Sequence, residues 1–214
     1  MNKILKNNNQ KIIIDNLDVN LELNGEETIT IFNTELHNLN LKIKKNAKIT
    51  VNDFRIIQNS NTEVNIEVAE AGEIIYNHAF VNHESYNLNI KMAFQANNGI
   101  AKVNINGIND GGIAKINIDG IIEKTKFNNE FLENINLINI NAGKGTCIPN
   151  ILIANSRVIA NHQVAIGKIN SNELEYLMSK GITKESAQKL ILNGFLIKTF
   201  KDKDLIIKIK ELKI

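Results

Sequence analysis

The sequence predicts a mainly β fold, namely a sandwich, a barrel or a β-solenoid, followed by a small helical region. Three observations lead to this prediction. Apolar and polar residues alternate from about Lys11 to about Val164, as they do in strands that bury one face. These strands recur about every ten residues. Near Gly167 the alternation gives way to the spacing of amphipathic helices.

The alternation is clearest where Ile, Val and Leu occupy every second position. β-branched residues suit a pleated, half-buried surface, and spacing at i, i+3 and i+4 is absent from this stretch. We therefore expect an almost purely β region. Its clearest strands are residues 19–23, 28–32, 39–43, 64–68 and 88–91.

An internal repeat helps to choose among the β architectures. Residues 99–108 are echoed almost letter for letter by residues 112–121. Near-identical strands favour a solenoid in which successive coils stack like on like, with Asn side chains forming ladders at the corners. A hairpin of two similar strands is the alternative, and periodicity alone leaves it open.

A first helix is expected after the change of period. Ser171 can cap it, and Gly181 can end it as a C′ residue. Its apolar positions are Leu174, Leu177 and Met178.

A second helix is expected directly afterwards, with Thr183 as its cap. Gly194 is expected to stop it before the apolar pair Phe195–Leu196. The tail from Asp202 to Ile214 is compatible with a helix or a strand, and its acidic start and basic end favour a helix. Helices with little of their own to cover suggest a docking element. The stripe of the second helix is Ala187, Leu190 and Ile191.

Composition narrows the functional classes. The 214 residues are 43% hydrophobic and 22% charged, as in a globular chain rather than a disordered one. The formal net charge of +2 leaves no strongly basic face for a phosphate backbone, so no nucleic-acid partner is expected. The start MNKILKNNNQ has no apolar signal region and no long apolar run follows, so no membrane partner is expected. With a single cysteine, a reducing, cytoplasmic location is favoured.

Few residues carry recognisable chemistry. The sequence has no phosphate-binding loop, nucleophile elbow or His-Glu-x-x-His helix. His78, His83 and Glu84 could bind a metal ion, although a surface loop is the favoured interpretation. Cys147 and His162 are candidate ligands for iron or an iron–sulfur cluster. Taken alone, such a Cys is more often a small buried hydrophobe and such a His a solvated corner residue.

Four ordered blocks provide the missing context. Residues 143–154, 158–169, 174–182 and 187–195 resemble the carboxy-terminal core of the SufB/SufD family of iron–sulfur cluster assembly proteins, with Tyr-Leu-Met-Ser-Lys-Gly-Ile at the centre. The resemblance implies a right-handed parallel β-helix over residues 1–168. It also implies a helical region over residues 169–214 that docks on the ABC-type ATPase SufC.

The resemblance also bears on individual residues. His162 falls where SufB and SufD share a histidine implicated in cluster assembly, whereas Gln163 replaces the glutamate of SufB-like members. The scaffold cysteine of SufB-like members would fall near Asn134 and is missing, which favours a SufD-like, short member without the usual amino-terminal region. The role of Cys147 cannot be inherited, but the residue stays a candidate. The expected partner-binding residues are Leu174, Leu177, Met178, Leu190, Ile191 and Phe195.

The expected function is therefore a non-enzymatic subunit of a Suf-type assembly complex. It would pair with itself or with a SufB/SufD-type subunit, dock on SufC, and share a transient iron–sulfur cluster through His162 and Cys147. A carbohydrate-active β-helix is the alternative, and it is disfavoured because the chain has no Trp and only three Tyr. A purely structural solenoid without a site is the third interpretation.

Overall fold

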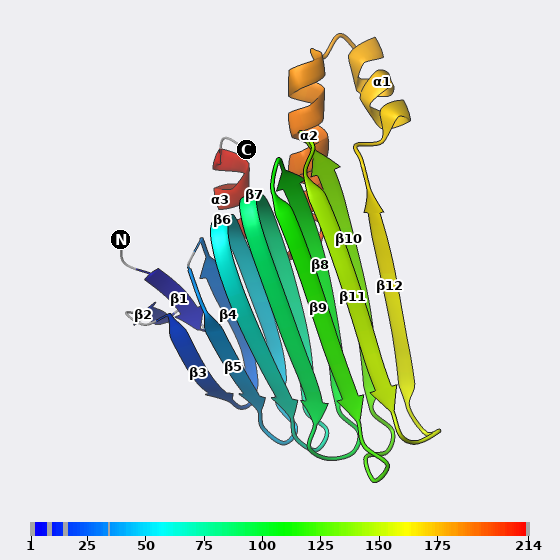
Figure 1. Cartoon of the computed structure of the whole chain (residues 1–214). Coiled ribbons are helices and arrows are strands. Elements are labelled where there is room, and N and C mark those ends of the chain that lie inside the picture. The colour runs from blue at the N-terminus through cyan, green and yellow to red at the C-terminus, as the bar shows by residue number, and fades with distance from the viewer. Residues whose placement is uncertain (1–2, 8–9, 15–16, 34, 213–214) are drawn as a thin grey trace.

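Parallel strands wind into a β-solenoid of about five turns in the computed structural model (Figure 1). The structure describes residues 3–7, 10–14, 17–33 and 35–212, the first two ranges as backbone only. The helix expected from Asp202 to Ile214 can therefore be compared with the structure as far as residue 212. Residues 213–214 lie outside the described part. The predicted mainly β fold with a carboxy-terminal helical region is confirmed, and of the three β architectures the solenoid is the one formed.

The solenoid has two parallel faces. The first contains β4 (Glu26–Phe32), the first halves of β6 (Lys48–Val68) and β7 (Glu73–Phe94), β8 (Ile100–Asp110), β10 (Glu130–Ile140) and β12 (Ile159–Gly167). The second contains β3 (Asp18–Leu23), β5 (Asn38–Ile43), the second halves of β6 and β7, β9 (Ile113–Ile122) and β11 (Lys144–Ile153). A hairpin of β1 (Lys3–Asn7) and β2 (Gln10–Ile14) joins β4 in antiparallel pairing.

The internal repeat has a different structural meaning from the one expected. Residues 99–108 fall in β8 of the first face and residues 112–121 in β9 of the second, and the two strands do not pair with each other. The two repeated segments therefore do not stack on each other in successive coils, and they do not form a hairpin. The repeat spans half a coil, because each coil contributes one strand to each face.

In the parallel strands, alternate residues point into the solenoid over most of their length, as the alternation predicted. Close packing explains one inward glycine, since a Cβ on Gly120 would overlap the ring of Phe131. Asparagine ladders connect the coils, and several follow strand faces instead of corners. Asn20, Asn40 and Asn65 form one such ladder, with amide hydrogen bonds of 2.7 and 2.8 Å.

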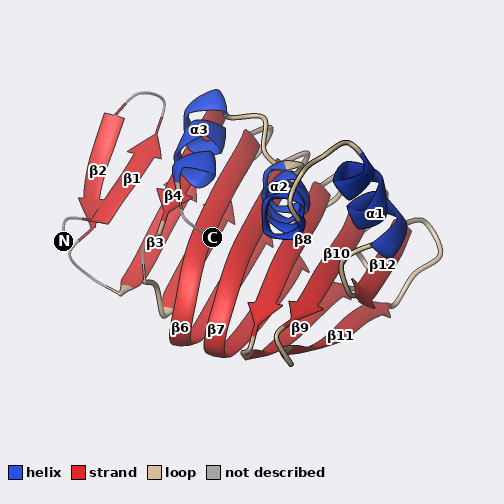
Figure 2. Ribbon diagram, turned by 90° about the horizontal axis from the view of Figure 1, so that it is seen from above, coloured by secondary structure: helices blue, strands red, loops and turns tan. Residues whose placement is uncertain are grey.

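Three helices follow the solenoid: α1 (Ser171–Ser179), α2 (Lys184–Ile197) and α3 (Lys203–Glu211). They lie along one side of the solenoid (Figure 2). A second apolar core forms where α2 and α3 pack on the outer side of the first face. Its buried members are Phe54, Ala79, Val81, Ile108, Leu192, Leu196, Phe200, Leu205 and Ile209.

The helix boundaries correct three expectations. Asn170, rather than Ser171, caps α1 by accepting from the backbone N–H groups of residues 172 and 173. Gly194 does not stop α2, which continues to Ile197 because Leu196 is buried in the second core. The buried residues of α2 are Ala187, Leu192 and Leu196. Of the expected stripe, therefore, only Ala187 is buried, and the expectation is wrong for Leu190 and Ile191.

Two further helix expectations hold, and one is corrected. Thr183 caps α2 as expected. The tail forms the favoured helix, in which Asp202 caps α3 and two lysines lie in the last turn. The helical region does have something to cover, because α2 and α3 share a core with the solenoid. Only α1 has no buried residue.

Candidate functional site at the open end of the solenoid

The structure places both predicted site residues on the last coil. Cys147 lies in β11 beside Ile116, a fully buried core residue, and therefore faces the interior. His162 lies in β12 beside Glu133, which is also buried. Because paired residues of parallel strands share a face, the register puts His162 on the interior side as well. The interior is open here, and the His162 side chain is exposed.

Glu133 is the unexpected member of this end. It occupies an inward position of β10 between Phe131 and Ile135, and it is only 3% exposed. Among the residues that the structure describes, neither of its carboxylate oxygens has a hydrogen-bond partner. Burial, with a smaller contribution from the charge of Asp119, raises the pKa of Glu133 to about 7.

The thiol of Cys147 also has a shifted pKa. Burial raises the pKa of its thiol to about 11, and the negative charge of Glu133 adds to the effect. The thiol packs against the main core. Cys147 is thus a partly buried, protonated thiol rather than a reactive surface thiolate.

The two predicted residues do not form a ready metal centre. Among the residues that the structure describes, no three His, Cys, Asp or Glu side chains are grouped so as to hold a metal ion. Asn134, near which the scaffold cysteine of SufB-like proteins was expected, is exposed and pairs with Gln163. This pair faces outward, on the opposite side of the sheet from Glu133 and His162.

The open end is also apolar. β11 and β12 are the last strands of their faces, each with a neighbour on one side only within the described chain. The exposed large aliphatic residues of these two strands are Ile148, Leu152, Ile153, Ile159, Val164 and Ile166. Ile153, Val164 and Ile166 pair with inward residues of the preceding strands, so a further coil would cover them, whereas the other three face outward.

The predicted partner-binding residues gather around α1 and α2. Met178 and Leu190 are exposed, as is the neighbouring Tyr176. The others are half-buried: Leu174, Leu177, Ile191 and Phe195. A groove of about 400 Å³ between the helices and β10 is lined by Leu190, Ile191 and Phe195 together with Lys168, Glu173 and Lys198.

A second cluster of polar groups lies inside the middle of the solenoid. The guanidinium of Arg55 donates to both carboxylate oxygens of Asp53, at 2.9 and 2.6 Å, and Tyr76 donates to the same carboxylate at 2.9 Å. Burial alone raises the pKa of Asp53, but the charge of Arg55 and the nearby His78 outweigh it and hold that pKa below its usual range.

The surface loop expected around His78 is not what the structure shows. His78 is fully buried in β7, with Nε2 at 3.0 Å from the hydroxyl oxygen of Tyr86, so it does not belong to a surface loop. His83 is a partly exposed residue of the same strand, with Nδ1 at 3.5 Å from a carboxylate oxygen of Asp110. The two histidines therefore have separate surroundings and form no joint site.

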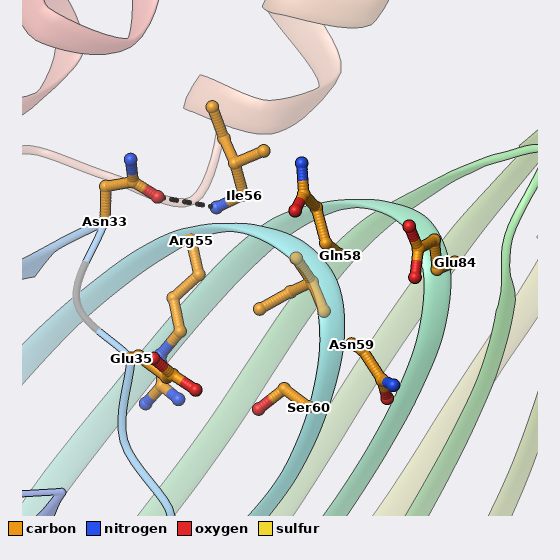
Figure 3. A pocket seen from close by; sticks show the side chains of 9 residues that line it. Asn33, Glu35, Arg55, Ile56, Gln58, Asn59, Ser60 and Glu84 are labelled. Atoms are coloured by element: carbon orange, nitrogen blue, oxygen red, sulfur yellow. Dashed lines mark hydrogen bonds between the residues drawn. The ribbon is translucent and has the colours of Figure 1, made fainter.

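A pocket of about 480 Å³ lies beside this cluster, where β6 turns from one face to the other (Figure 3). Arg55, Ser60 and Glu84 contribute to its lining. Both terminal nitrogens and Nε of Arg55 already donate within the protein, two of them to Asp53. The arginine is therefore committed to the interior and does not make this pocket an anion site.

Sequence reasoning missed Glu133 and the Asp53–Arg55 pair. In both cases the signal was a charged residue at an inward position of an alternating strand. Glu133 interrupts the apolar series Phe131, Ile135, Leu137, and Asp53 interrupts Ile49, Val51, Ile57. A charged residue at such a position is expensive unless it is paired or functional.

Comparisons with known proteins find similar sequences. Residues 21–195 match the model of a family described as SUF system FeS cluster assembly, SufBD core domain. The chain is 42% identical over 53 residues to the iron–sulfur cluster assembly protein SufD of Bacillus subtilis, covering 25% of this chain and 12% of that protein. It is 51% identical over 41 residues to an iron–sulfur cluster assembly SufBD family protein of Pyrococcus horikoshii, covering 19% of this chain and 9% of the relative.

A further match is more evenly distributed between the two chains. A SufBD family protein of Galdieria sulphuraria is 37% identical over 60 residues, which cover 28% of this chain and 27% of the relative. The matched segments thus span only a small part of these relatives. Among the described residues, no helix has the length and apolarity needed to cross a membrane.

Proposed function

Because the chain belongs to the SufBD core family of the SUF iron–sulfur cluster assembly system, we propose that it is a non-enzymatic subunit of an assembly complex. The observation that carries this proposal is the family match over residues 21–195, which runs through the solenoid and its first two helices. The relatives named above are assembly proteins by their own names.

The helical region is the proposed docking surface for a SufC-type ATPase. Met178 and Leu190 are exposed on α1 and α2, next to the groove that Phe195 lines. Exposed apolar side chains around a groove are typical of protein–protein contacts. α1 is suited to a contact of this kind because none of its residues is used for the internal core.

Replacing Leu190 with Asp is expected to weaken binding of a SufC-type ATPase by about 30-fold or more, because a charge would be buried in the contact. Ile207→Asp is the matched control, since Ile207 of α3 is 54% exposed and Leu190 is 55% exposed. Binding is measured by pull-down and by titration calorimetry, with circular dichroism as the check on folding. Equal binding by the two variants would move the docking surface elsewhere.

The open end is the proposed contact with a second SufB/SufD-type subunit. Unpaired strand edges and exposed aliphatic side chains both favour association with another chain. The second subunit is a copy of this chain or a SufB-like protein. Such pairing would bring His162 to the interface between the subunits.

Ile166→Asp is expected to shift the complex to monomers in analytical ultracentrifugation across the micromolar range. A carboxylate at the open end would have to lose its hydration on association. Ile121→Asp is the control, because Ile121 and Ile166 are both 44% exposed and Ile121 lies away from the end in β9. A wild-type chain that is monomeric with and without candidate partners would contradict the proposed contact.

His162 and Cys147 are the proposed residues for handling iron or a cluster in this complex. One Cys and one His from a single chain cannot enclose a cluster, so a cluster must be shared between subunits. It would be the cargo of the complex, exposed and labile. The test of His162 is given in the Discussion.

A further inference from the structure

The chain contains four Asn–Gly pairs, which begin at Asn24, Asn98, Asn106 and Asn193. Asparagine is a chemically labile residue, and a following glycine has no Cβ to hinder attack by its backbone nitrogen on the asparagine side chain. The attack requires a backbone nitrogen that is free of a hydrogen bond and an asparagine side chain that can rotate toward it. The structure gives the four pairs different surroundings in both respects.

Two of the pairs are held within the solenoid. In the pair that ends at Gly99, the backbone nitrogen of this glycine donates to Oδ1 of Asn129 at 2.7 Å. The pair at residues 106–107 lies in β8, between its two partner strands β7 and β10. Asn106 is fully buried, and its side-chain nitrogen donates to the carbonyl oxygen of Phe195 at 2.9 Å. Both pairs are therefore protected by hydrogen bonds.

The third protected pair, Asn193–Gly194, lies inside α2. Backbone N–H groups within a helix point along its axis to the carbonyl group four residues earlier, so the nitrogen of Gly194 is engaged. The Oδ1 atom of Asn193 is buried, which restricts rotation of its side chain.

The pair Asn24–Gly25 differs from the other three. It forms the turn between β3 and β4, and both of its residues are exposed. Among the described residues, neither the backbone nitrogen of Gly25 nor the side chain of Asn24 has a hydrogen-bond partner. Gly25 has a φ of 64°, and nothing lies within 4 Å of the place where a Cβ would be. The two groups that would react are thus adjacent, solvated and unpaired.

We propose that Asn24 is a site of spontaneous deamidation and isoaspartate formation. The backbone nitrogen of Gly25 attacks Cγ of Asn24 and gives its proton to solvent, and the side-chain nitrogen leaves as ammonia while a cyclic imide closes. Water then opens the imide at either carbonyl carbon, which leaves an aspartyl or an isoaspartyl residue at position 24. Water is the only co-reactant, so neither a cofactor nor a partner chain is needed.

The isoaspartyl product changes the first coil of the solenoid. It adds a carboxylate, and it passes the main chain through an additional methylene group between residues 24 and 25. The carbonyl oxygen of Gly25 accepts from the backbone nitrogen of Lys48 at 2.7 Å, and Glu26 pairs with Lys48 where β4 joins β6. A longer main chain displaces both contacts. The start of β4 is therefore expected to lose protection from hydrogen exchange in the modified chain.

The test is to incubate the 214-residue chain in mildly alkaline buffer and to follow each Asn–Gly pair by peptide mass spectrometry. Isoaspartate is detected by labelling with an isoaspartyl methyltransferase. In the folded chain we expect Asn24 to convert while Asn98, Asn106 and Asn193 stay intact. In concentrated urea we expect all four to convert, because unfolding frees the glycine nitrogens that the fold engages.

Two variants identify the reacting atoms. Gly25→Ala is expected to slow the labelling strongly, because a Cβ hinders the attacking nitrogen. The fold tolerates alanine at positive φ in a comparable turn, since Ala71 between β6 and β7 has a φ of 51°. Asn24→Gln is expected to abolish the labelling of the folded chain, since the longer side chain does not close the same ring. Circular dichroism of both variants checks the fold.

Three results would overturn the inference. The first is an Asn24 that stays intact in the folded chain while it converts in urea. The second is equal conversion of Asn24 and Asn98 in the folded chain, which would show that the hydrogen bond to Gly99 gives no protection. The third is labelling of Gly25→Ala as fast as that of the wild-type chain. The proposed assembly role is tested separately, at the other end of the solenoid and on its helices.

Discussion

Replacing Asp53 with Asn is expected to destabilise the protein by about 3–5 kcal/mol, because the substitution leaves the charge of Arg55 buried without a counter-ion. Asp53 and Arg55 lie inside the solenoid and share two hydrogen bonds, and neither is more than 1% exposed. The measurement is urea unfolding followed by circular dichroism at pH 7.

The double variant Asp53→Asn/Arg55→Met is the control for this prediction. Removing both charges is expected to restore much of the lost stability, since an apolar side chain of similar volume needs no partner. A cost below about 1 kcal/mol for the single variant would contradict the prediction. So would a double variant that is less stable than the single one.

The Asp53–Arg55 pair also makes the stability of the folded protein depend on pH. The pKa of Asp53 is lower in the folded protein than its ordinary value of 3.8, because Arg55 and His78 outweigh the effect of burial. The stabilisation is therefore complete above about pH 4 and is lost as the pH falls toward the folded-state pKa. Asp53→Asn should lack this component of acid unfolding.

The strands could be predicted from the sequence because the physical signal is local. Each coil buries alternate residues, so the pattern of Val64, Ile66 and Val68 is visible without knowledge of any neighbour. The helix caps at Thr183 and Asp202 are local signals of the same kind.

Pairing and helix burial depended on distant residues. The repeated strands at 99–108 and 112–121 could be assigned to two faces only once the length of a coil was known. The extension of α2 beyond Gly194 depends on Leu196 reaching a core shared with Phe54 and Ala79 of the solenoid. Leu192 and Leu196 have helical spacing, but the glycine between them is a local stop signal, and only the distant core shows that the helix continues.

The candidate site was predictable only in part. His162 and Cys147 were identified by residue type and resemblance, and the structure places both on the last coil. Glu133 was missed because a single acidic residue in a strand looks like a solvated one. Glu133 is two residues from both Phe131 and Ile135 and therefore faces the same side of β10. This spacing predicts burial only when the inward side of β10 is known.

His162→Ala is expected to abolish cluster formation in the reconstituted complex, while binding of SufC-type and SufB/SufD-type partners continues. The imidazole is exposed at the open end, where the proposed contact with a second subunit would complete the ligand set. Iron and acid-labile sulfide are measured after anaerobic reconstitution, with gel filtration to show that the complex is intact.

His37→Ala is the matched control for this experiment, because His37 is also exposed but lies in the turn before β5, near the other end of the solenoid. Cys147→Ser is reconstituted separately to determine whether the thiol contributes. Loss of cluster in His162→Ala but not in His37→Ala would support a role for His162 at the interface. Unchanged iron and sulfide in His162→Ala would instead leave it as a solvated histidine on a structural subunit, with any cluster held by the partner.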